Sequence, residues 1–366
     1  MSLLKEMIKV DISLIIKDLR KKFGEDSLFI LGSEEKLLQV ETRSSGSLAL
    51  DLALGGGYGK GRAVELRGAE KSGKSTLLCL AIAEAQKNEP DKYCAIIDTE
   101  HSFNPDWAKK LGVDLTSLVI SQPDKPAEDV YELIEAMLKT KSFSIIGLDS
   151  LAGLVPKEEF ECEEWDKEGR VGGISKINTK ATRKLINTGL LSDSGTTLIV
   201  INQLRDAIGV YSPYTVPTTT AGGRAWKHAF THQIDVSVGE YFSTGNGNDR
   251  VFHGQQIVTK IIKNKIAPPF RRAVIDIYYE YGVDRVSELV TVARQLGILQ
   301  SAGAWLRAID PITGEIIMYE DKELKFNGKE KAREFLNEDI QKNEGKVYLQ
   351  LLSLVNSLIK FNTKEY

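Results

Sequence analysis

Between residues 45 and 280, short apolar runs alternate with amphipathic helical patterns, and this alternation constrains the fold more than any other feature of the sequence. Runs in which almost every residue is apolar are typical of strands buried on both faces. Such strands, when they alternate with helices, form a mostly parallel sheet covered on both sides. We therefore expect an α/β fold with a mostly parallel, twisted sheet flanked by helices. The expected strands are 62–67, 93–98, 144–148, 197–202, 256–262 and 272–279, and the expected helices are 75–86 and 127–139.

The two ends of the chain follow other patterns. Residues 8–23 form an amphipathic helical pattern, whose apolar stripe packs either on its own domain or on a neighbouring subunit. After residue 290 we expect a small α+β unit. It comprises a hairpin of 305–309 and 315–319 around a turn at 310–314, then helices over 329–341 and 347–359.

The length of 366 residues, at ~100–200 residues per domain, fits two or three domains. We expect an N-terminal helix and oligomerisation segment at 1–40, a core at 41–285 and a C-terminal α+β domain at 286–366.

Composition excludes several classes of protein. The 51 acidic and 48 basic residues give a net charge of −3, which excludes a globally basic nucleic-acid coat but allows a local basic groove. Three cysteines without a Cys-x-x-Cys pair are typical of unpaired, inert thiols in a reducing compartment. No apolar stretch approaches the ~18–20 residues that span a bilayer, and the N-terminus lacks the pattern of a secretion signal. We expect a cytoplasmic protein with no membrane partner.

The string Gly68-Ala-Glu-Lys-Ser-Gly-Lys-Ser-Thr76 fits the phosphate-loop pattern G-x-x-x-x-G-K-[ST]. A strand pattern ends just before it and a helix pattern begins at Ser75, as phosphate binding requires. Glycines let backbone N–H groups turn towards the phosphates, and the helix N-terminus adds its positive dipole end. Lys74 would supply a charge to the phosphates and the Ser75 hydroxyl a ligand to Mg²⁺. The alternative is an ordinary glycine-rich turn between strand and helix.

Two carboxylates follow other predicted strands directly. Asp149 ends one of them and Glu100 lies just beyond another, so both are expected at the carboxyl edge of the sheet, where α/β folds bind ligands. Asp149 suits a metal shell, and Glu100 suits the orientation of an attacking water. The alternatives are a strand-ending cap and a surface glutamate. Together with the phosphate loop, these residues predict a P-loop NTPase that hydrolyses a nucleotide.

Two basic segments are candidate contacts for a phosphate chain. Residues 170–184 hold five basic residues and no acidic one, and a second acid-free run spans 260–272. A solvated basic face explains either segment equally well, and an acidic cluster at 158–168 precedes the first. In the first segment, the residues at helical spacing on nearly one face are Lys176, Lys180, Arg183 and Lys184.

Residues 202–223 are expected to form a long loop, which in a compact domain is usually functional. Gln203 lies where a core strand ends, so it either senses a γ-phosphate and moves the loop or merely caps its strand.

Across about residues 25–310 the chain resembles the RecA family of homologous-recombination proteins, in its bacterial or bacteriophage form. The resemblance implies an ATP-dependent helical filament on single-stranded DNA that takes up homologous duplex and exchanges strands. It also implies DNA-dependent ATP hydrolysis, and single-strand-binding and loading proteins as further partners. The matching strings are Thr42-Arg-Ser-Ser-Gly-Ser-Leu-Ala-Leu-Asp51, the phosphate loop, Ile97-Asp-Thr-Glu-His101, Leu111-Gly-Val-Asp114, Ser121-Gln-Pro-Asp124, Leu148-Asp-Ser150, Ile201-Asn-Gln-Leu-Arg205, Thr218-Thr-Thr-Ala-Gly-Gly223, Lys263-Asn-Lys-Ile-Ala-Pro-Pro-Phe270 and Gly303-Ala-Trp305.

The resemblance implies roles for single residues at the nucleotide. Glu100 is similar to the family's general base and Gln203 to its γ-phosphate sensor. Lys263 and Lys265 resemble the pair that reaches ATP across the subunit interface, where a cation from a neighbour makes hydrolysis depend on assembly. The implied ATP and Mg²⁺ contacts are Gly68, Glu70, Lys71, Ser72, Gly73, Lys74, Ser75, Thr76, Trp107, Asp149 and Tyr279, with Ser75 and Asp149 at the metal and Trp107 and Tyr279 near the adenine.

The family's two DNA-binding loops match about 162–173 and 204–223. Apolar residues there wedge between bases, while phosphate contacts hold the strand without reading its sequence. The implied DNA contacts are Lys176, Thr179 and Arg183 at the backbone, Val171 and Ile208 as wedges, Gly209, Gly222 and Gly223 close to phosphate, and Gly172 in the flexible first loop.

The chain also departs from the family. Val171 replaces a longer side chain, the first loop is unusually acidic, and the second carries an extra stretch at 211–214. The chain ends without the family's acidic tail, so we expect duplex access to be regulated differently. Two other functions remain as alternatives: a ring helicase with the same ATPase core, and a nucleotide-switched regulator that binds DNA without pairing it.

Overall fold

The computed structural model describes residues 2–24, 28, 40–162, 173–206, 218–220, 223–245 and 247–362. Its contacts divide the chain into two units, residues 1–41 and 42–366. The first unit contains α1 (Ser2–Phe23), which starts six residues earlier than predicted. Several of its apolar side chains are exposed within the described residues, namely Ile12, Leu14, Ile15 and Phe23. The predicted division into three domains stays a prediction.

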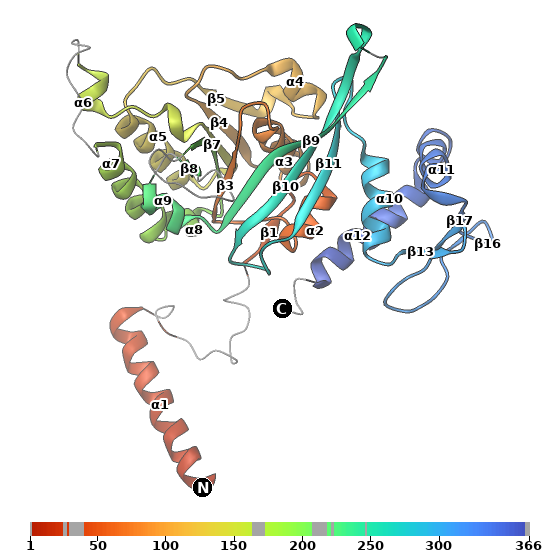
Figure 1. Ribbon diagram of the computed structural model, residues 1–366. Helices are drawn as coiled ribbons and strands as arrows, with labels where there is room; N and C mark the ends of the chain where they lie inside the picture. Colours follow the sequence, from red (N-terminus) through yellow and green to blue (C-terminus); the bar gives the residue numbers. More distant parts are fainter. Residues whose placement is uncertain are drawn as a thin grey trace, which may run out of the picture. The chain divides into compact units, whose positions relative to one another are not determined.

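A mixed sheet runs through the second unit in the order β12-β11-β10-β9-β3-β7-β6-β4-β5, with β8 attached to β7 (Figure 1). Neighbours from β9 through β3, β7, β6 and β4 to β5 pair in parallel, and the strands beyond β9 pair antiparallel. This confirms the α/β fold with a mostly parallel core. The strands are β3 (Ala63–Gly68), β4 (Tyr93–Asp98), β5 (Leu118–Ser121), β6 (Phe143–Asp149), β7 (Thr197–Asp206), β8 (Thr218–Thr220), β9 (His232–Thr244), β10 (Val251–Asn264), β11 (Arg272–Tyr278) and β12 (Gly282–Val283).

Helices cover both faces of this sheet. Successive strand residues point to opposite faces, so Ile96 and Ile145 enter the cluster under α2 and α3, whereas Ile97 and Ile146 enter the cluster under α5. This double burial explains why the strands are nearly continuous apolar runs. The helices of this part are α2 (Leu48–Leu54), α3 (Lys74–Asn88), α4 (Pro105–Lys110), α5 (Ala127–Thr140), α6 (Lys157–Phe160), α7 (Gly173–Thr182), α8 (Leu190–Ser194) and α9 (Gly223–Ala229), and a π-helical turn at Arg183–Asn187 continues α7.

The long loop predicted at 202–223 is wrong at both ends. β7 continues to Asp206, and its last residues pair antiparallel with β8, from Leu204 opposite Thr220 to Asp206 opposite Thr218. Three consecutive threonines favour this extended ribbon because β-branched residues fit a pleated strand. Residues 207–217 and 221–222 lie outside the described part of the chain.

The predicted C-terminal hairpin forms only next to its turn. The amide of Gly314 donates to the carbonyl of Asp310, and the arms pair through the antiparallel bridge of Ile309 and Ile316 and a hydrogen bond from the amide of Ile317 to the carbonyl of Ala308. The first arm lies mostly in β14 (Trp305–Ala308), which pairs with β13 (Leu299–Ala302) and β17 (Lys325–Phe326). Other short pairs join β1 (Thr42–Arg43) to β2 (Tyr58–Gly59) and β15 (Met318–Tyr319) to β16 (Lys322–Glu323).

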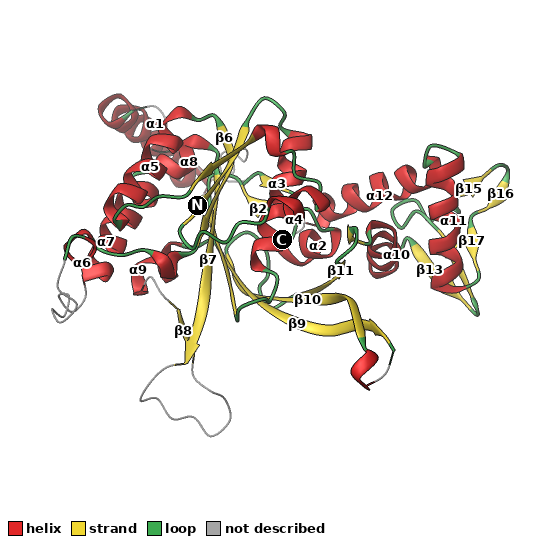
Figure 2. Cartoon of the chain, turned by 90° about the horizontal axis from the view of Figure 1, so that it is seen from above, coloured by secondary structure: helices red, strands yellow, loops and turns green. Residues whose placement is uncertain are grey.

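The C-terminal part has its own apolar cluster, built by α10 (Arg285–Gln295), α11 (Gly328–Lys342), α12 (Lys346–Asn362) and the strands beside them. Helix α2 of the core contributes Leu48, Ala49 and Leu52 to the edge of this cluster. Figure 2 shows α10, α11 and α12 gathered on one side of the core, away from α5 and α7.

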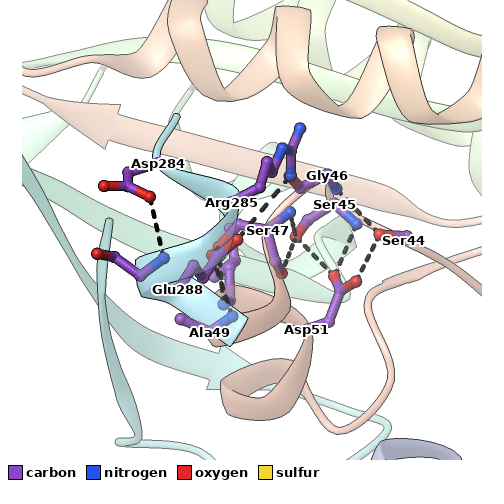
Figure 3. Close-up of polar contacts among 11 residues, drawn as sticks. Ser44, Ser45, Gly46, Ser47, Ala49, Asp51, Asp284, Arg285 and Glu288 are labelled. Atoms are coloured by element: carbon purple, nitrogen blue, oxygen red, sulfur yellow. Dashed lines mark hydrogen bonds and ion pairs between the residues drawn. The ribbon is translucent and has the colours of Figure 1, made fainter. Parts of the chain in front are cut away.

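A polar network joins α2 to α10 at this junction (Figure 3). Ser47 caps α2 by accepting from the amide of Leu50, and its hydroxyl donates to Glu288 Oε1. Arg285 donates to the carbonyl of Gly46. Burial raises the pKa of Glu288, although the Ser47 hydroxyl opposes this. The junction therefore rests on a buried carboxylate that holds the first turn of α2.

Candidate active site

The phosphate-loop string connects β3 to α3 as predicted. Close packing requires the first glycine, because a Cβ on Gly68 would lie 2.0 Å from the carbonyl oxygen of Val236; a Cβ on Gly73 would lie 2.4 Å from Ile257 Cδ1. Gly73 also has a φ of +101°, which L side chains rarely adopt. Helix α3 begins at the next residue, so its first N–H groups and its positive dipole end face the loop.

Lys74 is almost completely buried inside the loop. Its Nζ donates to the carbonyl oxygens of Gly68, at 3.1 Å, and Ala69, at 2.6 Å. Burial lowers the pKa of Lys74, while the nearby carboxylates, Asp149 first among them, oppose that shift. Because the hydrogen bonds that the described residues give this buried ammonium end on neutral carbonyls, an anion is favoured as an additional partner.

Ser75 and Asp149 meet beside Lys74. The Ser75 hydroxyl donates to Asp149 Oδ2 at 2.7 Å. Burial raises the pKa of Asp149 to about 6, Ser75 opposes this, and Glu100 and Asp98 add to it. A hydroxyl and a partly desolvated carboxylate are hard oxygen donors that suit Mg²⁺. The buried Ser72 hydroxyl lacks a hydrogen-bond partner among the described residues, so the loop also has an unused polar group for a ligand.

Glu100 lies beyond the end of β4, at the same edge of the sheet. Its Oε1 accepts from Gln203 Nε2 at 3.1 Å and from the Ser150 hydroxyl. Gln203 is opposite Gly68 in the parallel register of β7 and β3. The sheet therefore brings the predicted base and the predicted sensor into direct contact.

Sequence reasoning missed the residues that hold Glu100. Asp98, at the end of β4, accepts from Gln122 Nε2 and the amide of Phe103, both at 3.0 Å, and from the amide of Glu100 at 3.3 Å. Burial alone would raise the pKa of Asp98, but the hydrogen bonds have the larger combined effect, so the pKa is lower than usual. The ionised Asp98 thus fixes the turn that carries Glu100. The short spacing of Asp98 and Glu100 after a buried strand was the available signal for such a turn.

Two aromatic residues lie beside the loop. Trp107 on α4 donates from Nε1 to Thr76 Oγ1 at 3.1 Å. Tyr279 follows β11, and its carbonyl accepts from Lys110 Nζ on α4 at 3.1 Å. Gln255, which the sequence did not indicate, contacts both the Tyr279 hydroxyl at 3.3 Å and the Lys71 carbonyl at 3.4 Å. Trp107 is thus joined to the phosphate loop through Thr76, and Tyr279 through Gln255.

Lys263 and Lys265 lie elsewhere, at the end of β10. Lys263 Nζ donates to the carbonyls of Lys227 at 2.8 Å and His228 at 3.2 Å, and Lys265 Nζ donates to the latter at 3.3 Å. These carbonyls belong to the last turn of α9, whose dipole favours cations there. Burial, and then the charge of Lys265, lower the pKa of Lys263.

The predicted DNA contacts divide into two groups. Lys176 and Arg183 are exposed on α7 and the π-helical turn after it, while the Thr179 hydroxyl donates to the carbonyl of Ser175 at 2.8 Å. Lys184 donates to Glu135 Oε2 of α5 at 3.0 Å, so part of its charge is balanced within the chain. Gly223 begins α9. The other predicted contacts, Val171, Gly172, Ile208, Gly209 and Gly222, lie outside the described residues.

A phosphate loop at the carboxyl edge of a parallel sheet, with an acidic residue at the end of a neighbouring strand, defines the P-loop NTPases, and this chain is one of them. The family model described as "RecA N-terminal domain" matches residues 10–284 of this chain. Protein RecA of Halalkalibacterium halodurans is 40% identical over 332 residues, which cover 90% of this chain and 88% of the relative. The chain belongs to the RecA family.

Two further relatives agree with this assignment. Protein RecA of Chlorobaculum parvum is 41% identical over 295 residues, 80% of this chain and 81% of the relative. Protein RecA of Mycoplasma mobile is 38% identical over 350 residues, 95% of this chain and 96% of the relative. The chain is accordingly an ATP-dependent homologous-recombination protein, which forms a filament on single-stranded DNA and exchanges strands. Within the described residues, none of the helices is both long and apolar enough to cross a membrane.

Proposed function

We propose that the shared edge of β3, β4, β6 and β7 hydrolyses ATP with Mg²⁺ as cofactor, and that this hydrolysis is coupled to DNA. The observation that supports it is the meeting of the predicted groups at one edge of the sheet. Lys74 and Ser75 start α3, Asp149 ends β6, and Glu100 and Gln203 are in contact. Phosphoryl transfer needs chiefly such positioned charges and a group that orients the nucleophile.

Glu100 acts as the general base. Because Gln203 and Ser150 both donate to Oε1, the other oxygen, Oε2, is the one that accepts a proton. A water held by Oε2 attacks the terminal phosphorus, its proton passes to Oε2, and the bond from phosphorus to the bridging oxygen breaks, which leaves ADP and phosphate. A positioned base of this kind contributes about 10²–10⁴-fold to the rate.

Lys74 binds the nucleotide by exchanging a loop carbonyl for a phosphate oxygen, which is the stronger acceptor for an ammonium. Ser75 would bind the Mg²⁺ ion through its hydroxyl oxygen, and Asp149, which accepts from that hydroxyl, would orient it; the ion would neutralise charge on the phosphates. Trp107 and Tyr279 flank the adenine. The remaining ATP-binding residues are Gly68, Glu70, Lys71, Ser72, Gly73 and Thr76 of the loop.

A neighbouring subunit completes the site. Lys263 and Lys265 leave the carbonyls of α9 and contact the nucleotide of the next copy, which makes turnover depend on assembly. Gln203 carries the state of the nucleotide to DNA, because β7 continues from it into the ribbon with β8. The apolar side chains of α1, Ile12 and Ile15 among them, pack on a neighbour in the filament.

Lys176 and Arg183 contact the DNA backbone from one exposed face, with Gly223 at the start of α9. Both single strand and homologous duplex are bound in this way. Thr179 contributes to DNA binding through its position on α7, because its hydroxyl already donates to the carbonyl of Ser175. Single-strand-binding and loading proteins are the expected further partners.

ATP hydrolysis with and without unpaired oligonucleotide tests the proposal most directly. We expect turnover to rise strongly with single-stranded DNA, and electron micrographs of the same mixture to show open helical filaments. Duplex at the same nucleotide concentration serves as the control. An equal rate with and without DNA, or closed hexameric rings that unwind duplex, would overturn the proposal.

A further inference from the structure

A buried chain of three side chains links helices α5, α7 and α9. Trp226 on α9 donates from Nε1 to the Tyr131 hydroxyl on α5 at 3.2 Å, and this hydroxyl donates to Asn178 Oδ1 on α7 at 2.5 Å. Each of the three side chains is at most 6% exposed. Burial raises the pKa of Tyr131, so its hydroxyl keeps the proton that it donates. The single hydroxyl therefore uses both its donor and its acceptor capacity.

Helix α9 depends on this chain for its position. It has seven residues, too few for a stable isolated helix, and Trp226 is its one buried side chain. The indole ring stacks between Tyr131, with ring centres 6.2 Å apart, and Phe230, at 5.3 Å. Gly223, at the start of α9, lies beside Ser175 of α7. The two helices are thus held together both by their first turns and by the buried chain.

Both helices carry proposed functional residues. α7 carries Lys176, and the turn that continues it carries Arg183, while the last carbonyls of α9 bind Lys263 and Lys265. A motion of the lysine pair towards a neighbour's nucleotide therefore acts first on α9. Because Trp226 is hydrogen-bonded through Tyr131 to Asn178, a displacement of α9 strains bonds that also hold α7.

We propose that Trp226, Tyr131 and Asn178 are positioning residues that make α7 and α9 respond as one body, and so couple nucleotide contact to DNA affinity. The inference rests on the proposed function, because it needs α7 and α9 to carry DNA contacts. None of the three is hydrogen-bonded to the phosphate loop among the described residues, so in the absence of DNA their loss should leave nucleotide binding unchanged.

The test is Tyr131→Phe, which keeps the stacked ring and removes both hydrogen bonds. The measurement is ATP turnover as a function of oligo(dT) concentration, together with the KM for ATP without DNA. Leaving buried partners unpaired should raise the half-saturating oligo(dT) concentration about five- to tenfold, with the DNA-free KM within about twofold of wild type. Asn178→Leu should act similarly, and the double variant should add little because both changes break one chain.

Thr182→Val is the matched control. It removes a buried hydroxyl of α7, which donates to the Thr179 carbonyl at 3.0 Å and has no bond to α5 or α9 among the described residues. Its oligo(dT) dependence should match wild type. Wild-type DNA dependence in Tyr131→Phe, or an equal shift in Thr182→Val, would overturn the coupling.

The outcomes separate this inference from the proposed function. If wild type shows no DNA-stimulated turnover, the proposed function fails. If wild type is stimulated and Tyr131→Phe behaves identically, only the coupling fails. Should Tyr131→Phe melt well below wild type, Trp226→Phe keeps the stack and removes only the first hydrogen bond, and the same shift is expected from it.

Discussion

Asp149 at the nucleotide edge and Asp51 at the junction with the C-terminal part are both largely buried carboxylates whose pKa burial raises to about 6. Their surroundings differ. Asp51 accepts hydrogen bonds from the Ser44 hydroxyl and from the amide and hydroxyl of Ser45, at 2.5 to 2.7 Å. Among the described residues, the Asp149 carboxylate accepts one, from the Ser75 hydroxyl.

The difference separates a structural charge from a functional one. At the junction the protein supplies three donors, so Asp51 is already solvated by its own chain. At the edge one hydroxyl leaves the carboxylate with capacity for a cation. Substitutions at the edge should therefore change turnover more than stability, and substitutions at the junction should do the reverse.

The largest effect is expected for Glu100→Gln. The amide keeps an acceptor for Gln203 but cannot take a proton, so kcat should fall by about 10²–10⁴-fold while ATP and DNA binding persist. Steady-state turnover, nucleotide binding and thermal melting measure the three properties. The control, Glu132→Gln, changes an exposed glutamate of α5 and should leave all of them unchanged. A wild-type rate of ATP hydrolysis in Glu100→Gln would show that Glu100 is not the general base.

Asp149→Asn should weaken the response to Mg²⁺. Loss of the carboxylate partner of Ser75 should raise the Mg²⁺ concentration for half-maximal turnover by about 10–100-fold. Titration of Mg²⁺ at saturating ATP measures this. Asp51→Asn is the comparison variant and should leave the Mg²⁺ dependence unchanged; equal shifts in both variants would erase the distinction between the two regions.

The position of these edge residues was predictable because strands that run in parallel bring their carboxyl ends to one edge. Glu100 and Gln203 lie far apart in sequence, yet Glu100 follows the buried strand β4, Gln203 follows the apolar run of β7, and they form a hydrogen bond. Ser150, Gln255 and the chain through Tyr131 were not predictable, because each contact joins segments whose spacing carries no pattern.

The fold was predictable where strands are buried on both faces. The strand at 93–98 matches β4, and the predicted helix at 127–139 matches α5 within one residue. β9 escaped prediction because its outer half is largely exposed and polar, so its sequence lacks an apolar run. The C-terminal hairpin was predicted only in part because a turn signal fixes the local reversal and not the partner of each arm.

Titration of Asp51 at the junction should make the stability of the protein depend on pH. The pKa of Asp51 is about 6 in the folded state against 3.8 ordinarily, so the folded state binds more protons between these values. The free energy of unfolding therefore falls as pH rises through this window and stays lower above it. Asn cannot ionise, so the free energy of unfolding of Asp51→Asn should not fall in this way. Relative to that of wild type, it should rise by up to about 3 kcal/mol between pH 4 and 7, at 1.36 kcal/mol per pKa unit.

Urea unfolding of both proteins across this range measures the difference, in which the other titrating groups largely cancel. Parallel pH profiles of the two proteins would show that Asp51 does not titrate in this window.

Ser47→Ala should destabilise the junction without changing the chemistry. It removes the cap of α2 and the hydroxyl that donates to Glu288, which together should lower the free energy of unfolding by about 1–2 kcal/mol. Chemical denaturation measures this loss, and kcat at a temperature well below the transition should stay at the wild-type value. Ser301→Ala, at an exposed position of β13, is the control. A loss of kcat larger than the loss of stability explains would connect the junction to the active site.

The smallest effect extends the same contrast to the DNA face. Lys184 is paired with Glu135, whereas Lys176 is exposed and has no ion pair among the described residues. Lys176→Gln should therefore lower DNA affinity for every sequence and reduce the slope of log affinity against log salt by about 1. Lys184→Gln is the matched control and should leave the slope unchanged, because its charge is already neutralised within the chain. Fluorescence titration of labelled oligonucleotide at several salt concentrations measures both slopes, and a larger change in Lys184→Gln would mean that the ion pair opens when DNA binds.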